Sequence, residues 1–234
     1  MLLHGAHPGE RMIPLATIIA NEGFAAFTYD RRGTGKSGGD DPRENVSAER
    51  LRVLGQDAVA AATLVSAEFG GDAAVGIVGL SHAGWVAPLA ASMSRAIRFF
   101  GLWSGPVCTT SEELHFSALA ERDPDFWRTR SDVQVAEYMK SVEYRPDDLD
   151  PSKTLAGVSV PALWIFGGKD NSIPVALSIA RLQALIRDGR SNFRYRLIPD
   201  DGHNLADSPR QEGFRYMISW LNELAAGELQ EPER

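Results

Sequence analysis

The sequence predicts an α/β fold in which a mostly parallel sheet of about six strands lies between two layers of helices. Short apolar runs alternate with helical patterns along the chain, which favours a parallel sheet with helical crossovers. The runs at 73–80 and 160–166 are apolar almost throughout, as in strands that are buried on both faces. Of the 234 residues 44% are apolar, which is ordinary for one globular domain.

Each predicted strand is an apolar run bounded by glycine, proline, aspartate or arginine. The predicted strands are 1–5, 24–29, 73–80, 97–103, 160–166 and 193–198. Apolar residues at helical spacing predict the helices 10–22, 47–69, 85–95, 174–187 and 209–225. In such sheets the active site lies at the carboxyl ends of the strands, so catalytic residues are expected just after each apolar run.

One long connection interrupts the alternation of strand and helix. Residues 108–158 are polar, acidic and aromatic, and a connection of this length is not expected to lack structure. We predict a small helical cap over the site there. The core then comprises 1–107 and 159–228, and 229–234 form a solvated tail.

Composition excludes several classes of protein. The net charge is −7 and the arginines are scattered, so no nucleic-acid partner is expected. No uncharged apolar run reaches about 18 residues and no signal-peptide pattern is visible, so we expect a cytoplasmic protein without a membrane partner. Cys108 is the single cysteine, which rules out an intramolecular disulfide.

The strongest motif surrounds Ser81. The sequence Gly79-Leu80-Ser81-His82-Ala83-Gly84 stands between a predicted strand and a predicted helix. A sharp turn there lifts the serine hydroxyl out of the sheet, and small neighbours let the backbone pass close to adjacent strands. The usual pattern is G-x-S-x-G, from which Ala83 is a mild departure. Ser81 is the predicted nucleophile.

An acid and a base follow two later strands. Asp170 comes after the run at 160–166, and His203 after the run at 193–198. The order Ser, Asp, His is that of α/β-hydrolases. His203 would take the serine proton as general base, and Asp170 would orient its ring.

Each assignment has alternatives. Asp170 could cap a nearby helix. Asp200 and Asp201 compete as the acid, and His115 competes as the base.

The start of the chain carries His4-Gly5-Ala6-His7-Pro8-Gly9. A His-Gly pair at a strand end commonly supplies a second amide for an oxyanion hole. We assign the hole to the backbone N–H groups of Ala6 and His82. His4 and His7 lack a third ligand, so no metal site is predicted.

Residues 33–37 read GTGKS, which resembles the end of a phosphate-binding loop. That loop needs glycine where this chain has Asp30. In α/β-hydrolases the same residues form a tight structural turn, which is the favoured interpretation here.

Together these motifs resemble the α/β-hydrolase superfamily, and more closely its bacterial esterase and prolyl-oligopeptidase-like (dienelactone-hydrolase-like) branch. The resemblance spans almost the whole chain apart from the cap. It implies a three-layer α/β-hydrolase fold that lacks the usual first two strands, so 24–29 could form an exposed edge and favour a homodimer.

The resemblance also implies hydrolysis of a small or medium acyl ester through an acyl-serine intermediate, without a cofactor. A serine peptidase, an acyl-thioesterase and a non-catalytic binding protein remain alternatives. The residues predicted to contact the substrate lie near these strand ends and in the cap: His7, Trp85, Trp103, His115, Phe116 and Trp127.

Overall fold

A single parallel sheet organises the molecule. The computed structural model describes residues 1–5, 11–40, 46–71, 73–123 and 125–227. Within these ranges five strands lie in chain order and all run parallel. They are β1 (Leu2–Leu3), β2 (Val75–Leu80), β3 (Ile97–Trp103), β4 (Ala162–Gly167) and β5 (Phe193–Ile198).

The inner strands β2, β3 and β4 are mostly apolar because helices cover both faces of the sheet. In β4, Ala162, Trp164 and Phe166 belong to one apolar core, whereas Leu163 and Ile165 belong to the other. Side chains of a strand alternate between faces, so a strand that is buried on both sides must be apolar at every position.

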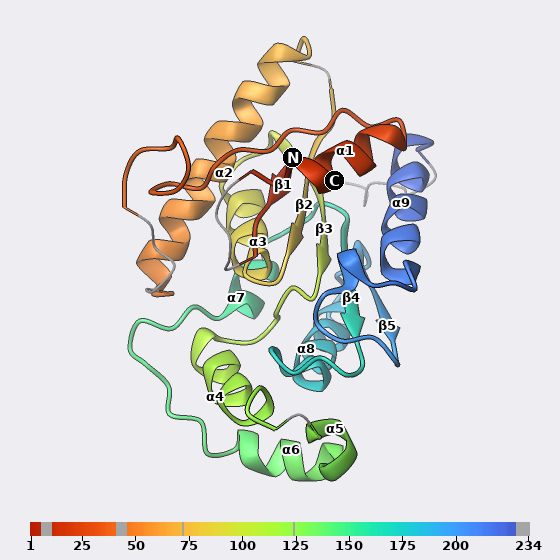
Figure 1. Cartoon of the computed structure of the whole chain (residues 1–234). Helices are drawn as coiled ribbons and strands as arrows, with labels where there is room; N and C mark the ends of the chain where they lie inside the picture. The colour runs from red at the N-terminus through yellow and green to blue at the C-terminus, as the bar shows by residue number, and fades with distance from the viewer. Residues whose placement is uncertain (6–10, 41–45, 72, 124, 228–234) are drawn as a thin grey trace.

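The two helical layers complete the predicted α/β architecture (Figure 1). On one face pack α2 (Ala48–Glu68), α3 (Ala83–Met93), α7 (Pro151–Leu155) and α8 (Val175–Arg187). On the other face pack α1 (Ile13–Asn21) and α9 (Glu212–Ala225). Among the described helices, none combines the length and the apolar character needed to cross a membrane.

A group of small helices stands at the carboxyl ends of the strands (Figure 1). It consists of α4 (Thr110–Ala120), α5 (Phe126–Thr129) and α6 (Asp132–Met139). These helices have their own apolar core of Phe116, Ala120, Phe126 and Val135. We call α4–α6 the cap helices. Although α7 also lies within 108–158, it packs against α3 and α8 of the main domain.

The segment 24–29 is not a strand, contrary to the sequence prediction. It runs in an extended conformation beside β1, and the Leu2 N–H donates to the Phe27 carbonyl at 2.9 Å. Its apolar residues Phe24 and Ala26 pack against the core shared with α1 and α9. The apolar residues of this segment therefore serve to pack against the helices, and the segment does not pair with β1 as a strand of the sheet.

Candidate active site

Ser81 occupies a strained turn between β2 and α3. Its φ is +47°, a left-handed conformation that is unfavourable for a residue other than glycine. The Ser81 N–H donates to the Trp103 carbonyl at 2.9 Å, and the Gly84 N–H donates to the Ser81 carbonyl at 2.7 Å. The chain thus turns directly from the sheet into α3 at the serine, as the motif predicts.

The small residues around Ser81 are required by close packing. A Cβ on Gly79 would collide with the Ala83 methyl group, and one on Gly84 would collide with Pro106. A Cβ on Gly5 would lie 3.7 Å from the Cβ of Ser81, so the end of β1 lies beside the serine. Ala83 is tolerated in the motif because Gly79 leaves room for its methyl group.

Asp170 and His203 form a hydrogen-bonded pair. His203 Nδ1 lies 2.8 Å from Asp170 Oδ2, and the Asp170 side chain is fully buried. The second oxygen, Oδ1, accepts hydrogen bonds from the N–H groups of Ser172 at 2.8 Å and Ile173 at 3.0 Å. The turn after β4 therefore fixes the carboxylate so that one oxygen is aimed at the imidazole.

The loops that carry this pair pack backbone against backbone. A Cβ on Gly167 would collide with the carbonyls of Asp201 and Gly202, and the Lys169 N–H donates to the Asp201 carbonyl at 2.9 Å. The Gly-Gly pair before Asp170 is therefore needed to let the histidine loop approach.

Ser104 joins the histidine loop to the strand beside the nucleophile, and sequence reasoning missed it. Its φ is +49°, and its hydroxyl donates to the His203 carbonyl at 2.7 Å. The preceding residue, Trp103, accepts from the Ser81 N–H. The only sequence signal was the Ser-Gly-Pro that follows the strand at 97–103.

The Ser81 hydroxyl itself makes no hydrogen bond to any residue that the structure describes, His203 included. In proteins without substrate, hydrogen bonds of this kind are often long and tighten when the substrate binds. The fold places the Asp170–His203 pair and the turn that carries Ser81 at the same end of the parallel sheet, with β3 between β2 and β4.

Negative charge surrounds the imidazole. Burial opposes charge on His203, but the hydrogen bond to Asp170 and the charges of Asp170, Glu113 and Glu121 outweigh burial and raise its pKa above 6.5. Glu113 of α4, also missed by sequence reasoning, has its pKa raised to about 7, by burial first and then by Glu121. Its signal was the pair of glutamates at the start of the predicted cap.

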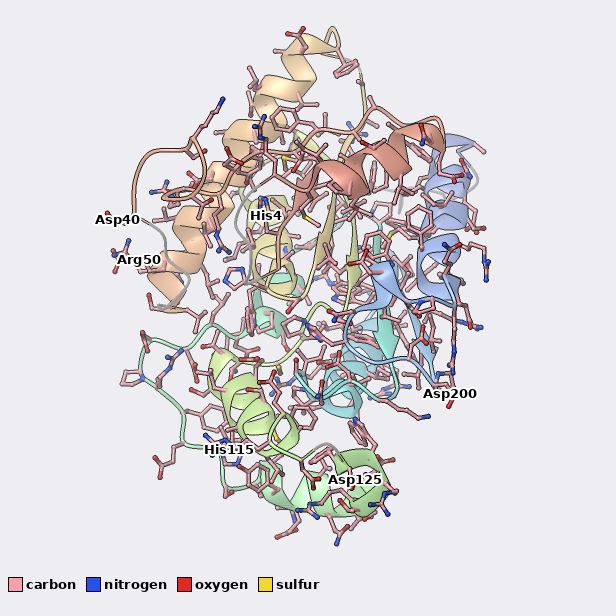
Figure 2. The ribbon with its side chains drawn as sticks, in the orientation of Figure 1. His4, Asp40, Arg50, His115, Asp125 and Asp200 are labelled. Carbon is pink, nitrogen blue, oxygen red and sulfur yellow. The ribbon has the colours of Figure 1, made fainter. Side chains whose placement is uncertain are left out.

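The competing acids and the competing base have other partners. Asp200 is exposed and pairs with Lys169 at 2.8 Å, and Asp201 accepts from the Ser208 hydroxyl at 3.0 Å. His115 stacks on Tyr138 within the cap at a ring separation of 4.1 Å. Figure 2 shows His115 among the cap helices and Asp200 at the outside of the molecule.

Several residues predicted to contact substrate are instead packing residues. Trp103 and Phe116 are fully buried, and Trp103 Nε1 donates to the Gly213 carbonyl at 3.0 Å. Trp85 is buried and donates to the Cys108 carbonyl at 2.8 Å. No ring surface of Trp103 or Phe116 is left for a substrate, and His115 is held by Tyr138.

Trp127 does reach the site, although through its own hydrogen bond. It is half-buried, and Nε1 donates to the Asp170 carbonyl at 3.1 Å, so the cap rests directly on the loop of the acid.

His82 lies at the N-terminal end of α3, where a backbone amide can face an oxyanion. Ala6 and His7 lie outside the described residues.

The loop at 33–37 folds around a carboxylate of the chain itself. Asp30 accepts hydrogen bonds from the N–H groups of Lys36 at 3.0 Å and Arg11 at 2.9 Å. A Cβ on Gly35 would collide with the same carboxylate. The Lys36 amide is therefore used within the turn, which confirms the structural interpretation. Within the described ranges no group of three or more His, Cys, Asp or Glu is arranged to hold a metal ion.

Comparison with solved structures finds the same fold. An esterase of Pyrococcus furiosus superposes with a TM-score of 0.69 at 17% identity, covering 95% of this chain and 80% of that one. A monoacylglycerol lipase of Paleococcus ferrophilus gives 0.60 at 19% identity, covering 94% and 92%. An acylaminoacyl peptidase of Pyrococcus horikoshii gives 0.66 at 17% identity, covering 100% of this chain and 37% of that one.

Comparison with curated proteins finds no match. The family model that matches is that of the prolyl oligopeptidase family, over residues 14–228, which is most of the chain. With the fold and the strand-end residues described above, this match establishes that the chain belongs to the prolyl oligopeptidase family and is a serine hydrolase with the α/β-hydrolase fold.

Proposed function

We propose that the protein hydrolyses carboxylic esters of small to medium acyl chains through an acyl-enzyme intermediate on Ser81. The observation that supports this most strongly is the 2.8 Å hydrogen bond between His203 Nδ1 and the buried Asp170, which follows β4 at the same end of the parallel sheet as the strained turn at Ser81. An anionic partner on Nδ1 leaves Nε2 as the basic nitrogen, which is the form that a general base needs.

The reaction divides into two acyl transfers. Ser81 Oγ attacks the ester carbonyl while His203 Nε2 accepts its proton, and the negative charge on the carbonyl oxygen is held by the backbone N–H groups of His82 and Ala6. The intermediate collapses, the C–O bond to the alcohol breaks, and His203 returns the proton to the departing oxygen.

Water then completes the cycle. His203 takes a proton from a water molecule, which attacks the acyl-serine, and the proton passes to Ser81 as the carboxylic acid leaves. Asp170 stays ionised throughout and stabilises the imidazolium that forms twice in each turnover.

A second candidate is peptide hydrolysis on the same three residues. Membership of the prolyl oligopeptidase family favours it, because the acyl-serine step is common to esters and amides. The cap is small and carries its own core, which supports a substrate of modest size in either case.

The test is turnover of three matched substrate sets: nitrophenyl esters of graded chain length, aminoacyl amides, and acyl-CoA thioesters. We expect the short esters to give the highest kcat/KM, and Ser81→Ala to lower kcat by roughly 10³-fold or more with an unchanged circular dichroism spectrum. Faster turnover of the amides would establish a peptidase, and faster turnover of the thioesters would establish a thioesterase.

A further inference from the structure

The cap supplies one carboxylate to the site that the hydrolytic mechanism does not use. We propose that Glu113 of α4 makes the active site selective for esters that carry a positive charge near the scissile bond. This inference rests on the proposed function and deepens it, because it names the chemical class of the substrate.

The placement of α4 aims Glu113 at the catalytic loops. Phe116 packs against Trp127, whose indole N–H bonds to the Asp170 carbonyl. Glu121 accepts a hydrogen bond from the Ser172 hydroxyl at 2.9 Å. Because an α-helix turns by about 100° per residue, Phe116 and Glu121 lie on either side of Glu113 around the helix axis. Glu113 therefore projects from the face of α4 that meets the loop of Asp170.

The three glutamates of this helix region have different partners. Glu112 is buried and forms a two-pronged ion pair with Arg181 at 2.5 and 2.7 Å. Glu121 bonds to Ser172. The Glu113 side chain makes no hydrogen bond or ion pair with any described residue, yet it is half-buried and its charge acts on both His203 and Asp170.

Among the residues that the structure describes, the negative charge here has no matching cation. In that part of the chain the charged groups that act on Glu113 are Glu121, Asp170 and His203, and of these only protonated His203 is positive. A half-buried carboxylate in such surroundings gains most from a cation brought by the ligand, because screening by water is reduced there. An anionic substrate would meet repulsion from Glu113, Glu121 and Asp170.

The charge state of Glu113 makes the selectivity depend on pH. Burial and then Glu121 raise the pKa of Glu113 to about 7, so the carboxyl is neutral in acid and charged in base. We expect the preference for a cationic over a neutral ester to rise from pH 6 to pH 8. Hydrolysis of both substrates needs neutral His203, so the effect of its titration cancels in the ratio of the two rates.

The experiment compares isosteric pairs that differ only in charge. One pair carries the charge on the acyl side: 4-nitrophenyl esters of 4-(trimethylammonio)butanoate and 5,5-dimethylhexanoate. The other carries it on the alcohol side: the choline and 3,3-dimethylbutyl esters of butyrate. We expect kcat/KM for the cation to exceed that for its neutral isostere by about tenfold at pH 8 in at least one pair.

Two variants assign the preference to its source. Glu113→Gln should bring the ratio to about one, whereas Glu137→Gln, which removes a charge paired with Lys140 on the exposed side of α6, should keep it. Each ratio is measured within one variant, so a loss of folded protein does not affect it.

Equal rates within both pairs for the wild type, or a preference that survives Glu113→Gln, would overturn the assignment of Glu113 while leaving ester hydrolysis in place. Failure to hydrolyse any of the four esters would overturn the proposed function, and this inference with it.

Discussion

Two serines with left-handed backbone conformations stand side by side at the ends of β2 and β3. Ser81 has φ +47° and Ser104 has φ +49°, and such conformations cost about 1–3 kcal/mol each for residues other than glycine. Both are held by backbone hydrogen bonds to a neighbouring strand, from Ser81 to Trp103 and from Ser104 to Ile165 at 2.8 Å. The sheet thus maintains strain at the two points that position Ser81 and His203.

Ser104 is therefore expected to be a positioning residue for the base. Ser104→Ala removes the hydroxyl that donates to the His203 carbonyl, and we expect kcat to fall by about ten- to a hundredfold with KM little changed. Steady-state kinetics on a nitrophenyl ester give this split. Ser92→Ala is the matched control, since it removes a hydroxyl bond of 2.7 Å to the Leu89 carbonyl within α3. Equal losses in both variants would contradict a specific role.

The pH dependence follows from the charges around His203. The imidazole acts as a base only when neutral, and its pKa is raised by Asp170, Glu113 and Glu121 against the effect of burial. Activity should therefore fall as the pH drops through a midpoint above 6.5. Glu113→Gln removes one of the charges that favour the imidazolium, so the midpoint of kcat/KM should move to lower pH. A midpoint that moves upward in this variant would contradict the arrangement.

At the scale of elements, an ion pair between a half-buried arginine and a buried glutamate fastens the cap to the main domain. The Glu112 carboxylate of α4 accepts hydrogen bonds from Nη1 and Nη2 of Arg181 on α8, and it also accepts one from the Tyr144 hydroxyl at 2.9 Å. The same carboxylate closes the capping box at Thr109, with the Thr109 N–H donating at 2.7 Å. The Glu112 side chain thus helps to cap the N-terminus of α4 and also joins α4 to α8 through Arg181.

Loss of Arg181 should be costly because it leaves Glu112 charged and buried. Arg181→Ala is expected to lower the free energy of unfolding by about 3 kcal/mol in urea denaturation, and Glu112→Gln/Arg181→Ala should recover part of the loss. Burial opposes the charge on Glu112, but Arg181 and Thr109 lower its pKa below 4.5 in the folded protein. Its stabilisation is therefore present above pH 4.5 and lost as the pH falls through the folded pKa. An unchanged unfolding midpoint for Arg181→Ala would contradict the clamp.

Strand and helix positions follow the sequence closely where burial on both faces leaves a continuous apolar run. The predicted strands 73–80 and 160–166 match β2 and β4 to within two residues at each end. The prediction of a strand at 24–29 was wrong because an apolar run does not reveal whether it pairs. The prediction that Trp103 contacts the substrate was wrong because the pleat of β3 turns its ring into the core. The motif does not show which way the strand is pleated. The role of Glu113 was not predicted because it depends on how the cap helices pack over the catalytic loops, which the sequence does not show.

At the scale of the whole molecule, the side opposite β5 exposes apolar surface. An apolar cavity of about 160 Å³ lies between β1, β2 and the segment 24–26. Leu64 and Phe69 of the nearby α2 region are 61% and 55% exposed. Clusters of exposed apolar side chains favour association.

We therefore keep the prediction of a homodimer through this side, now formed by β1 and the extended segment and not by a sixth strand. Sedimentation velocity across a concentration series should show a dimer, which Phe69→Ser weakens. A single monomeric species at all concentrations would contradict it.

Every step of the proposed hydrolysis requires an activated serine at the end of β2. The most direct measurement is labelling of the native protein with a fluorophosphonate at pH 8, followed by peptide mass spectrometry, because such probes react only with an activated hydroxyl. We predict a single adduct on Ser81 that disappears in His203→Ala while the variant keeps its circular dichroism spectrum. Absence of an adduct, or an adduct on another residue, would contradict the proposed chemistry.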